Sequence, residues 1–160
     1  MAKDLVYLAQ RMHDIAKNVE IAVNLTVQDT AIFTAAHLAK GTPVDVGTAR
    51  SNWMLSLGAA SQGIRPAFSP FASRWRPVPG VNPGGSLSET RNQAGVTWSA
   101  TAAIKGRKPG QAVYIANNLP YIARLNQGHS KQAPSGFIQR AVKTSAAQAE
   151  LIAVKRLKQI

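Results

Sequence analysis

The sequence contains no cysteine among its 160 residues. This absence excludes disulfide bonds, thiolate metal ligands and a cysteine nucleophile. It also agrees with assembly in a reducing cytoplasm. Charged residues make up only 16% of the chain and hydrophobic residues 45%, which predicts a folded globular protein and not a disordered one.

Long hydrophobic runs are missing as well. No apolar stretch approaches the roughly 20 residues that a membrane-spanning helix needs. Asp4, Arg11 and Asp14 interrupt the N-terminal segment before the apolar core of a secretion signal can form. We therefore expect a soluble protein with no membrane partner.

Acidic residues are few and unevenly placed. The chain has 19 basic and 7 acidic residues, a net charge of +12, and residues 46–149 hold twelve of the basic residues against Glu89 alone. Residues 1–45 carry a net charge of −1. A positive block of this size attracts polyanions, of which nucleic acid is the most common. An acidic protein partner and a merely solvated surface are the alternatives.

The residues that usually build catalytic and metal sites are scattered. His13, His37 and His129 have no carboxylate or second histidine at metal-ligand spacing, which favours surface or packing roles. Glu89 and Asp45 alone do not make the acidic cluster of a magnesium-dependent nuclease. Neither a phosphate-binding P-loop nor a G-x-S-x-G nucleophile motif is present. We expect no enzyme, cofactor or metal, with a small nuclease as a minor alternative.

The N-terminal quarter of the chain predicts one long helix over residues 3–39. Its apolar residues recur at spacings of three and four, as expected for one side of a helix: Leu5, Leu8, Met12, Ile15, Val19 and Ala22. The stripe shifts near residues 24–30, which predicts a kink or a change of packing partner. A stripe of this length favours an intramolecular packing face over a free coiled coil, and Gly41 and Pro43 end the helix.

The rest of the chain predicts short strands, one long loop and two further helices. Alternating apolar residues indicate strands at 51–58 and 96–100, and an apolar run indicates a buried strand at 112–116. Residues 63–88 hold five of the nine prolines and predict a long loop, while the basic residues 105–110 resemble a hairpin tip.

A short helix is expected around Tyr121 and Leu125, closed by Gly128, and a final helix should begin near residues 135–137 with Ser135 as its N-cap. The predicted apolar face of the final helix consists of Ile138, Ala141, Val142, Ser145, Ala149 and Ile152. The prediction is a single α+β domain over residues 1–160: a long N-terminal helix, a small antiparallel sheet with a long Pro/Gly-rich loop, and a C-terminal helix.

Two groups of side chains are candidates for contact with partners. In the loop, Phe68, Phe71 and Trp75 favour docking into a neighbouring subunit, because aromatic residues are enriched in interface cores. Arg74 and Arg76 flank Trp75, so base stacking with phosphate contacts is the alternative. The predicted tip carries Lys105, Arg107 and Lys108, which favour contact with a phosphate backbone or an acidic protein.

Two sequence stretches resemble a known family. These are TPVDVGTARSNW at residues 42–53 and NNLPYIARLNQGHSKQAPSGF at residues 117–137. Together they resemble the tail-completion, minor tail protein Z-like family of neck proteins in long-tailed bacteriophages. That family combines a long N-terminal helix with T-P-V-D-T-G-x-x-R-x-x-W and, later, Y-x-x-x-L-E-x-G-x-S-x-Q-A-P-x-G. The matching residues, which we expect to maintain the fold, are Pro43, Asp45, Gly47, Arg50, Trp53, Tyr121, Gly128 and Gly136.

The chain also departs from the family pattern. Val46 and Thr48 replace the usual threonine and arginine, and Asn126 replaces the usual acid, which removes a potential ion pair. Residues 63–88 correspond to a region that varies in such proteins. In physical terms, Asp45 should bond its own downstream amides in a tight turn, and Trp53 should be the first large core residue of the strand.

The resemblance implies a structural virion protein. It implies a homo-oligomeric ring in the phage neck, sixfold in preference to twelvefold, that completes or caps the tail and joins it to the DNA-filled head. Its partners would be copies of itself, the tail terminator or tube, the connector or portal-side proteins, and the genomic DNA in the channel. The alternative is a stand-alone, sequence-nonspecific DNA-binding protein of phage packaging.

Overall fold

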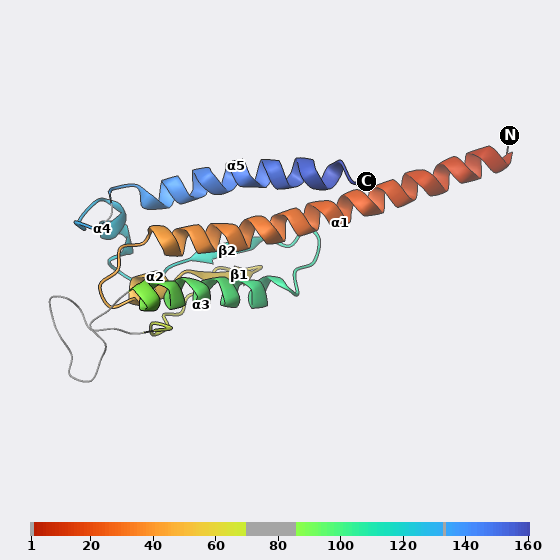
Figure 1. Cartoon of the computed structure of the whole chain (residues 1–160). Coiled ribbons are helices and arrows are strands. Elements are labelled where there is room, and N and C mark those ends of the chain that lie inside the picture. Colours follow the sequence, from red (N-terminus) through yellow and green to blue (C-terminus); the bar gives the residue numbers. More distant parts are fainter. Residues whose placement is uncertain (1, 70–85, 133) are drawn as a thin grey trace.

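Long helices surround a small antiparallel sheet in this chain (Figure 1). The computed structural model describes residues 2–69, 86–132 and 134–160. In chain order the elements are α1 (Ala2–Gly41), α2 (Thr48–Ser51), β1 (Met54–Leu57), α3 (Ser86–Ile104), β2 (Val113–Ala116), α4 (Ile122–Asn126) and α5 (Phe137–Leu157). The predicted α+β class is confirmed, with helix as the larger part.

The C-terminal half of α1 is the central layer of the molecule. Helix α5 runs antiparallel along one side of it, and the sheet with α3 covers the other side (Figure 1). The α1 residues at this junction are mostly small, and small side chains allow helices to approach closely. The buried core comprises Ala31, Ala35, Leu38, Ala39, Trp53, Leu55, Val96, Ala100, Ile104, Phe137 and Ala141.

The two strands pair in antiparallel register, from Met54 opposite Ala116 to Leu57 opposite Val113. Both lie inside the predicted ranges 51–58 and 112–116, and each is shorter than predicted. Trp53 and Leu55 are buried, which confirms the buried face inferred from alternation.

Residues 96–100 form part of helix α3, so the strand predicted there is wrong. Val96, Ala100 and Ile104 are all buried and lie four residues apart, which is the spacing of one helix face. Trp98, the central residue of the predicted strand, is exposed on the helix surface. Because α3 begins at Ser86, the predicted loop also ends earlier than residue 88. Residues 70–85 of that loop lie outside the described residues.

The basic segment 105–110 connects α3 to β2, so it is not the tip of a hairpin between two strands. The Arg107 amide donates to the carbonyl of Ile104 at 3.0 Å, which closes the end of α3. The Arg107 side chain donates to the Gln111 carbonyl at 3.0 Å and also to Asn24 Oδ1 on α1. Arg107 therefore holds the turn against α1, and Lys105 and Lys108 remain exposed.

Helix α1 is continuous from Ala2 to Gly41, and its environment changes where the apolar stripe shifts. Residues 4–21 are all exposed, and Ala22 is the first buried residue. The predicted intramolecular packing face is therefore wrong for residues 5–19. Figure 1 shows the reason: α5 ends part-way along α1, and the N-terminal turns extend beyond it. Within the described residues, no helix is both long and apolar enough to cross a bilayer.

Helix α5 begins at Phe137, within the predicted range, but Ser135 is not its N-cap. Gly136 occupies that position with a positive φ of 77°, and as a glycine it makes no side-chain cap of its own. Ala141 and Ser145 are buried on the predicted face, whereas Val142 is exposed. The face is narrower than predicted because α5 packs mainly against one neighbour, α1.

Candidate functional site

The first motif segment, residues 42–53, turns the chain from α1 into β1. The Thr42 hydroxyl donates to the Leu38 carbonyl at 2.6 Å and accepts from Trp53 Nε1 at 2.7 Å. Trp53 is only 5% exposed, so its indole N–H needs this partner. The predicted role of Trp53 as a core residue is confirmed.

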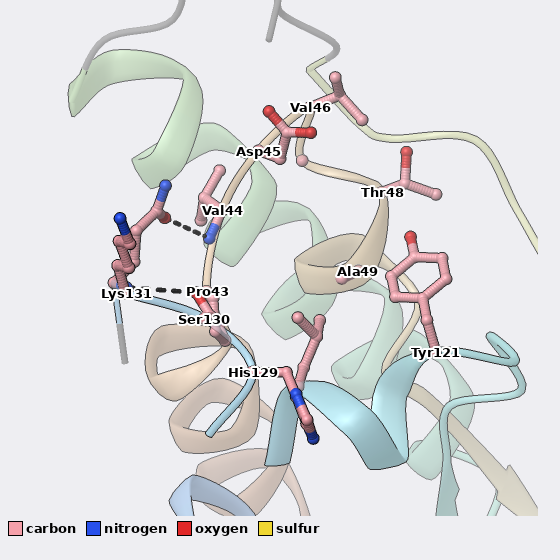
Figure 2. Close-up of a pocket in the computed structure, with 13 residues that line it drawn as sticks. Pro43, Val44, Asp45, Val46, Thr48, Ala49, Tyr121, His129, Ser130 and Lys131 are labelled. Carbon is pink, nitrogen blue, oxygen red and sulfur yellow. Dashed lines mark hydrogen bonds between the residues drawn. The ribbon is translucent and has the colours of Figure 1, made fainter. Parts of the chain in front are cut away.

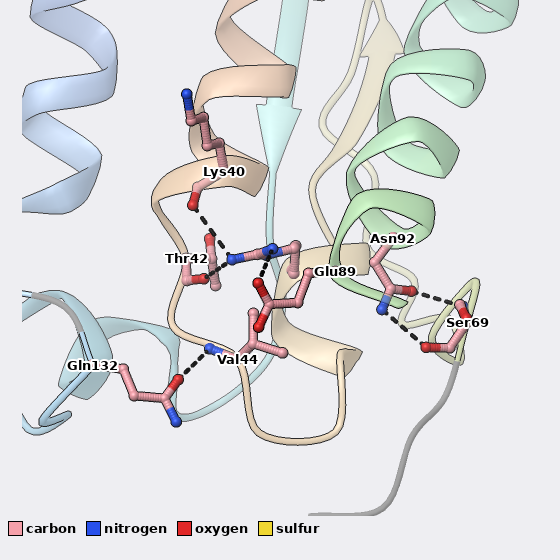
Figure 3. A network of polar contacts seen from close by, with 8 residues as sticks. Lys40, Thr42, Val44, Ser69, Glu89, Asn92 and Gln132 are labelled. Carbon is pink, nitrogen blue, oxygen red and sulfur yellow. Dashed lines mark hydrogen bonds and ion pairs between the residues drawn. The ribbon is translucent and has the colours of Figure 1, made fainter. Parts of the chain in front are cut away.

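Arg50 binds the C-terminal end of α1, and Figure 3 labels its partners Lys40, Thr42 and Glu89. Its Nη2 donates to the carbonyls of Thr42 at 3.1 Å and Lys40 at 3.4 Å, and its Nη1 lies 3.8 Å from the Glu89 carboxylate. The last carbonyls of a helix lack intrahelical partners, so a cation is well placed there. Burial lowers the pKa of the Arg50 guanidinium, and the charge of Glu89 opposes that change. Arg50 thus joins α1, α2 and α3.

The second motif segment, residues 117–137, folds directly against the first. Val44 N donates to Gln132 Oε1 at 3.0 Å, and Asn117 Nδ2 donates to the Ala49 carbonyl at 2.9 Å. These contacts join residues 88 and 68 positions apart in the sequence. The two stretches that carry the family resemblance therefore form one continuous structure.

A cavity of about 500 Å³ lies between the two motif segments (Figure 2). Its lining combines apolar walls with hydroxyl groups and charges of both signs: Pro43, Val44, Asp45, Val46, Gly47, Thr48, Ala49, Tyr121, Leu125, His129, Ser130, Lys131 and Gln132. Burial, and secondarily the charge of Asp45, raises the pKa of Tyr121. Such a lining can hold an extended segment or a side chain of a partner protein.

The turn does not use Asp45 as predicted. Asp45 is exposed, and within the described part of the chain its carboxylate accepts no hydrogen bond from the downstream amides. Gly47 makes the turn instead, with a φ of 85° that other residues rarely adopt. The Asp45 carboxylate is consequently available to a partner at the cavity. Among the described residues, no group of three or more histidines and carboxylates is arranged to hold a metal ion.

Comparison with protein-family models, curated proteins and solved structures finds no match.

Asn126 has a structural role that the sequence did not indicate. Its Oδ1 accepts from the Ile138 amide at 3.0 Å, its Nδ2 donates to Gln139 Oε1 at 3.0 Å, and its carbonyl accepts from Gly136 N at 2.7 Å. The side chain thereby caps the first turn of α5. The residues next to the start of α5 do not reveal this cap, because the capping side chain belongs to α4. The amide supplies both a donor and an acceptor here, whereas the acid of the family pattern supplies acceptors alone.

Gly128 closes α4 as predicted, with a positive φ of 94°. A Cβ at this position would lie 3.2 Å from the Ser135 Cβ. Gly128→Ala should therefore lower the free energy of unfolding by about 1–2 kcal/mol, the usual cost of a left-handed conformation. Urea denaturation followed by circular dichroism would measure it. Gly106→Ala is the control, since a Cβ there meets no atom within 4 Å; equal effects of the two substitutions would contradict the assignment.

Phe68, Lys105, Arg107 and Lys108, which were also predicted as site residues, do not line the cavity. The Phe68 ring packs against Gly95 of α3, where a Cβ would lie 2.4 Å from its Cγ, and the Arg65 guanidinium covers the ring at 4.4 Å from the centroid. Lys105 and Lys108 follow the C-terminal end of α3, in the segment that leads to β2. Phe71, Arg74, Trp75 and Arg76 lie outside the described residues. The interface and nucleic-acid roles of these residues stay predictions.

A buried polar network behind the motifs was also missed. Arg65 donates to the carbonyls of Ser51 at 2.6 Å and Trp53 at 2.9 Å, and to Ser99 Oγ at 3.0 Å. Burial lowers the pKa of its guanidinium. Asn52 and Asn92 are fully buried. Asn52 donates to the Arg65 carbonyl, and Asn92 accepts from the Ser69 amide. Arg50 and Arg65, two of the twelve basic residues between 46 and 149, thus act inside the fold.

Proposed function

We propose that this chain is a structural subunit of a bacteriophage neck. Copies of it form a homo-oligomeric ring, sixfold in preference to twelvefold, that completes or caps the tail and joins it to the DNA-filled head. The ring contacts tail terminator or tube proteins on one side and connector or portal-side proteins on the other. The proposal places the protein in the virion, and in the host cytoplasm during assembly.

One observation carries the assembly part of this proposal: the N-terminal half of α1 exposes a row of large apolar side chains. Leu5, Leu8, Met12 and Ile15 are all exposed, and Leu5 reaches 68%. An exposed apolar patch of this kind usually marks a site of protein–protein contact. A structural subunit whose helix is covered only in an assembly explains the feature better than an isolated globular protein does.

The body of the molecule supplies further surfaces for assembly. A closed ring needs two different complementary faces on each subunit. The cavity between the motif segments is one such concave surface. Leu151 and Val154 form an exposed apolar surface on α5, flanked by Lys155 and Lys158. These surfaces lie on separate elements, which supports contacts with more than one neighbour.

The charge of the chain supports a role next to DNA. Although Arg50 and Arg65 act inside the fold, Lys105, Lys108 and Arg124 are exposed. Exposed cations that contact phosphates without reading bases allow DNA to move through a channel without a fixed register.

Two measurements test the proposed function. Light scattering after gel filtration, with electron microscopy of the purified protein, should reveal rings. Mass spectrometry of purified virions should detect the chain, and labelling should place it at the neck. A protein that stays monomeric at high concentration and is absent from particles would contradict the proposal.

The exposed lysines of the α3–β2 turn favour the stand-alone DNA-binding alternative, which can be tested separately. Replacing Lys105 and Lys108 with glutamine should leave folding unchanged, because both side chains are exposed. If both contact phosphates, the plot of log K against log[salt] for binding to double-stranded DNA should become shallower by about 1.8 in slope. A salt-titrated mobility-shift assay measures this. Lys17→Gln with Lys143→Gln is the control of equal charge; the same slope for both pairs would remove the turn from the DNA contact.

A further inference from the structure

The exposed part of α1 carries a seam suited to association with identical helices. Leu5, Leu8, Met12, Ile15 and Val19 follow the alternating three- and four-residue spacing of a coiled coil. All five are exposed. We infer that residues 4–21 pack against the same segment of neighbouring copies and form a helical bundle within the assembly. This inference deepens the proposed function and rests on it.

The charge of the segment favours a second copy as its occupant. Residues 4–21 hold Arg11 and Lys17 against Asp4, Asp14 and Glu20, a net charge of −1, in a chain whose total is +12. Copies of a strongly basic protein repel one another least where their charges balance. The apolar stripe and the nearly neutral segment coincide, so identical chains can approach here at the lowest electrostatic cost.

The width of the apolar surface indicates more than two helices. Ala9 and Ala16 are also exposed and extend the stripe to about 120° of the helix circumference at 100° per residue. A narrow seam is enough for a two-stranded coil, whereas a wider stripe contacts two neighbours at once. The stripe is about 21 Å long and about 10 Å wide, at 1.5 Å per residue. The area of such a stripe is far below the roughly 800 Å² that each partner buries in a standard interface, so the association of a single pair of helices would be weak.

Other surfaces match this segment less well. The exposed apolar residues Leu151, Val154 and Leu157 on α5 span about 9 Å of helix, less than half the length of the α1 stripe. Helices that lie on membranes are typically rich in lysine and arginine on their polar face, and this one is not. A second copy of α1 is the partner that matches in length, spacing and charge.

A pair of double variants tests the inference in the full-length protein. Leu8→Glu with Ile15→Glu places two carboxylates on the stripe. Val6→Glu with Ile21→Glu adds the same charges away from the stripe. Around the helix axis, Val6 lies about 160° from Leu8 and Ile21 lies about 120° from Ile15. Ile15 and Ile21 are similarly exposed, at 45% and 49%, so neither double variant should disturb the fold. The stripe variant should weaken self-association at least about tenfold relative to the control, because buried carboxylates are costly.

Single cysteines give a positional test, since the chain has none of its own. Leu5→Cys, Met12→Cys and Val19→Cys should each form disulfide-linked dimers on oxidation if the helices are parallel. Antiparallel helices would link Met12→Cys to itself and Leu5→Cys to Val19→Cys. Gln10→Cys, on the opposite face, should cross-link at least about tenfold more slowly in both cases.

The outcomes separate this inference from the proposed function. A stripe variant that assembles like its control, or equal cross-linking of Met12→Cys and Gln10→Cys, overturns the bundle while leaving a ring formed by the body intact. Cross-linking of the stripe cysteines to cysteines on α5, or binding of the stripe to lipid vesicles, also overturns it. An unmodified protein that is monomeric at every concentration overturns both.

Discussion

Replacing Trp53 with alanine should lower the free energy of unfolding by about 3–5 kcal/mol, the usual cost of removing a buried aromatic side chain. Trp53 lies between the end of α1 and β1, within the cluster that includes Leu38 and Leu55. Its removal would leave a cavity there and would also remove the indole N–H that donates a hydrogen bond to Thr42 Oγ1. Urea denaturation followed by far-ultraviolet circular dichroism would measure the loss.

Trp98 provides the matched control. It lies on α3 and is 72% exposed, so Trp98→Ala should change stability by no more than about 0.5 kcal/mol. Both variants should be compared at a concentration where their oligomeric state is the same, because assembly contributes to apparent stability. Denaturation curves of Trp53→Ala and Trp98→Ala that coincide would show that Trp53 is not an anchor of the core.

The sequence predicted the outer helices and both observed strands because local signals define them. Helix α1 ends at Gly41 just before Pro43, and α5 follows directly after Gly136. Glycine and proline act through their own backbone restrictions, so their effect is visible without knowledge of the fold.

Helix α3 was mistaken for a strand because its local signals are ambiguous. Val96 and Ala100 lie four residues apart, a spacing that fits both a helix face and a strand face. Thr97 and Thr101 favour strands by propensity, yet their hydroxyls donate to the carbonyls four residues earlier, at 3.1 and 2.9 Å. Burial of Val96 and Ala100 against α1 and β1 decides the conformation, and that contact is tertiary.

The candidate site was only partly predictable for a similar reason. Pro43 and Gly128 were predicted to end helices from their residue types. The contacts that bring the two turns together, from Val44 to Gln132 and from Asn117 to Ala49, join distant parts of the chain. Asparagine and glutamine are common in loops, so their sequence positions did not distinguish a buried partner from an exposed residue.

Replacing Asn92 with alanine should lower the free energy of unfolding by about 2–4 kcal/mol, through loss of buried hydrogen bonds. Asn92 is fully buried, and its Oδ1 accepts from Ser51 Oγ at 2.9 Å and Ser69 N at 2.7 Å. Its Nδ2 donates to the Ser69 carbonyl at 2.9 Å (Figure 3). Alanine would leave these groups unpaired, and its better helix propensity would offset only about 0.5 kcal/mol.

The loss of stability in Asn92→Ala should be local in origin, because the Asn92 side chain holds the segment before residue 70 against α3. The Phe68 amide donates to Ser51 Oγ at 3.2 Å, so the same network fixes two consecutive residues of that segment. Amide hydrogen exchange at Phe68 and Ser69 should therefore accelerate more in Asn92→Ala than exchange in the core of α1. Gln93→Ala, one position along α3, should leave both rates unchanged. If Asn92→Ala accelerates exchange equally throughout the molecule, Asn92 stabilises the core as a whole and not this attachment.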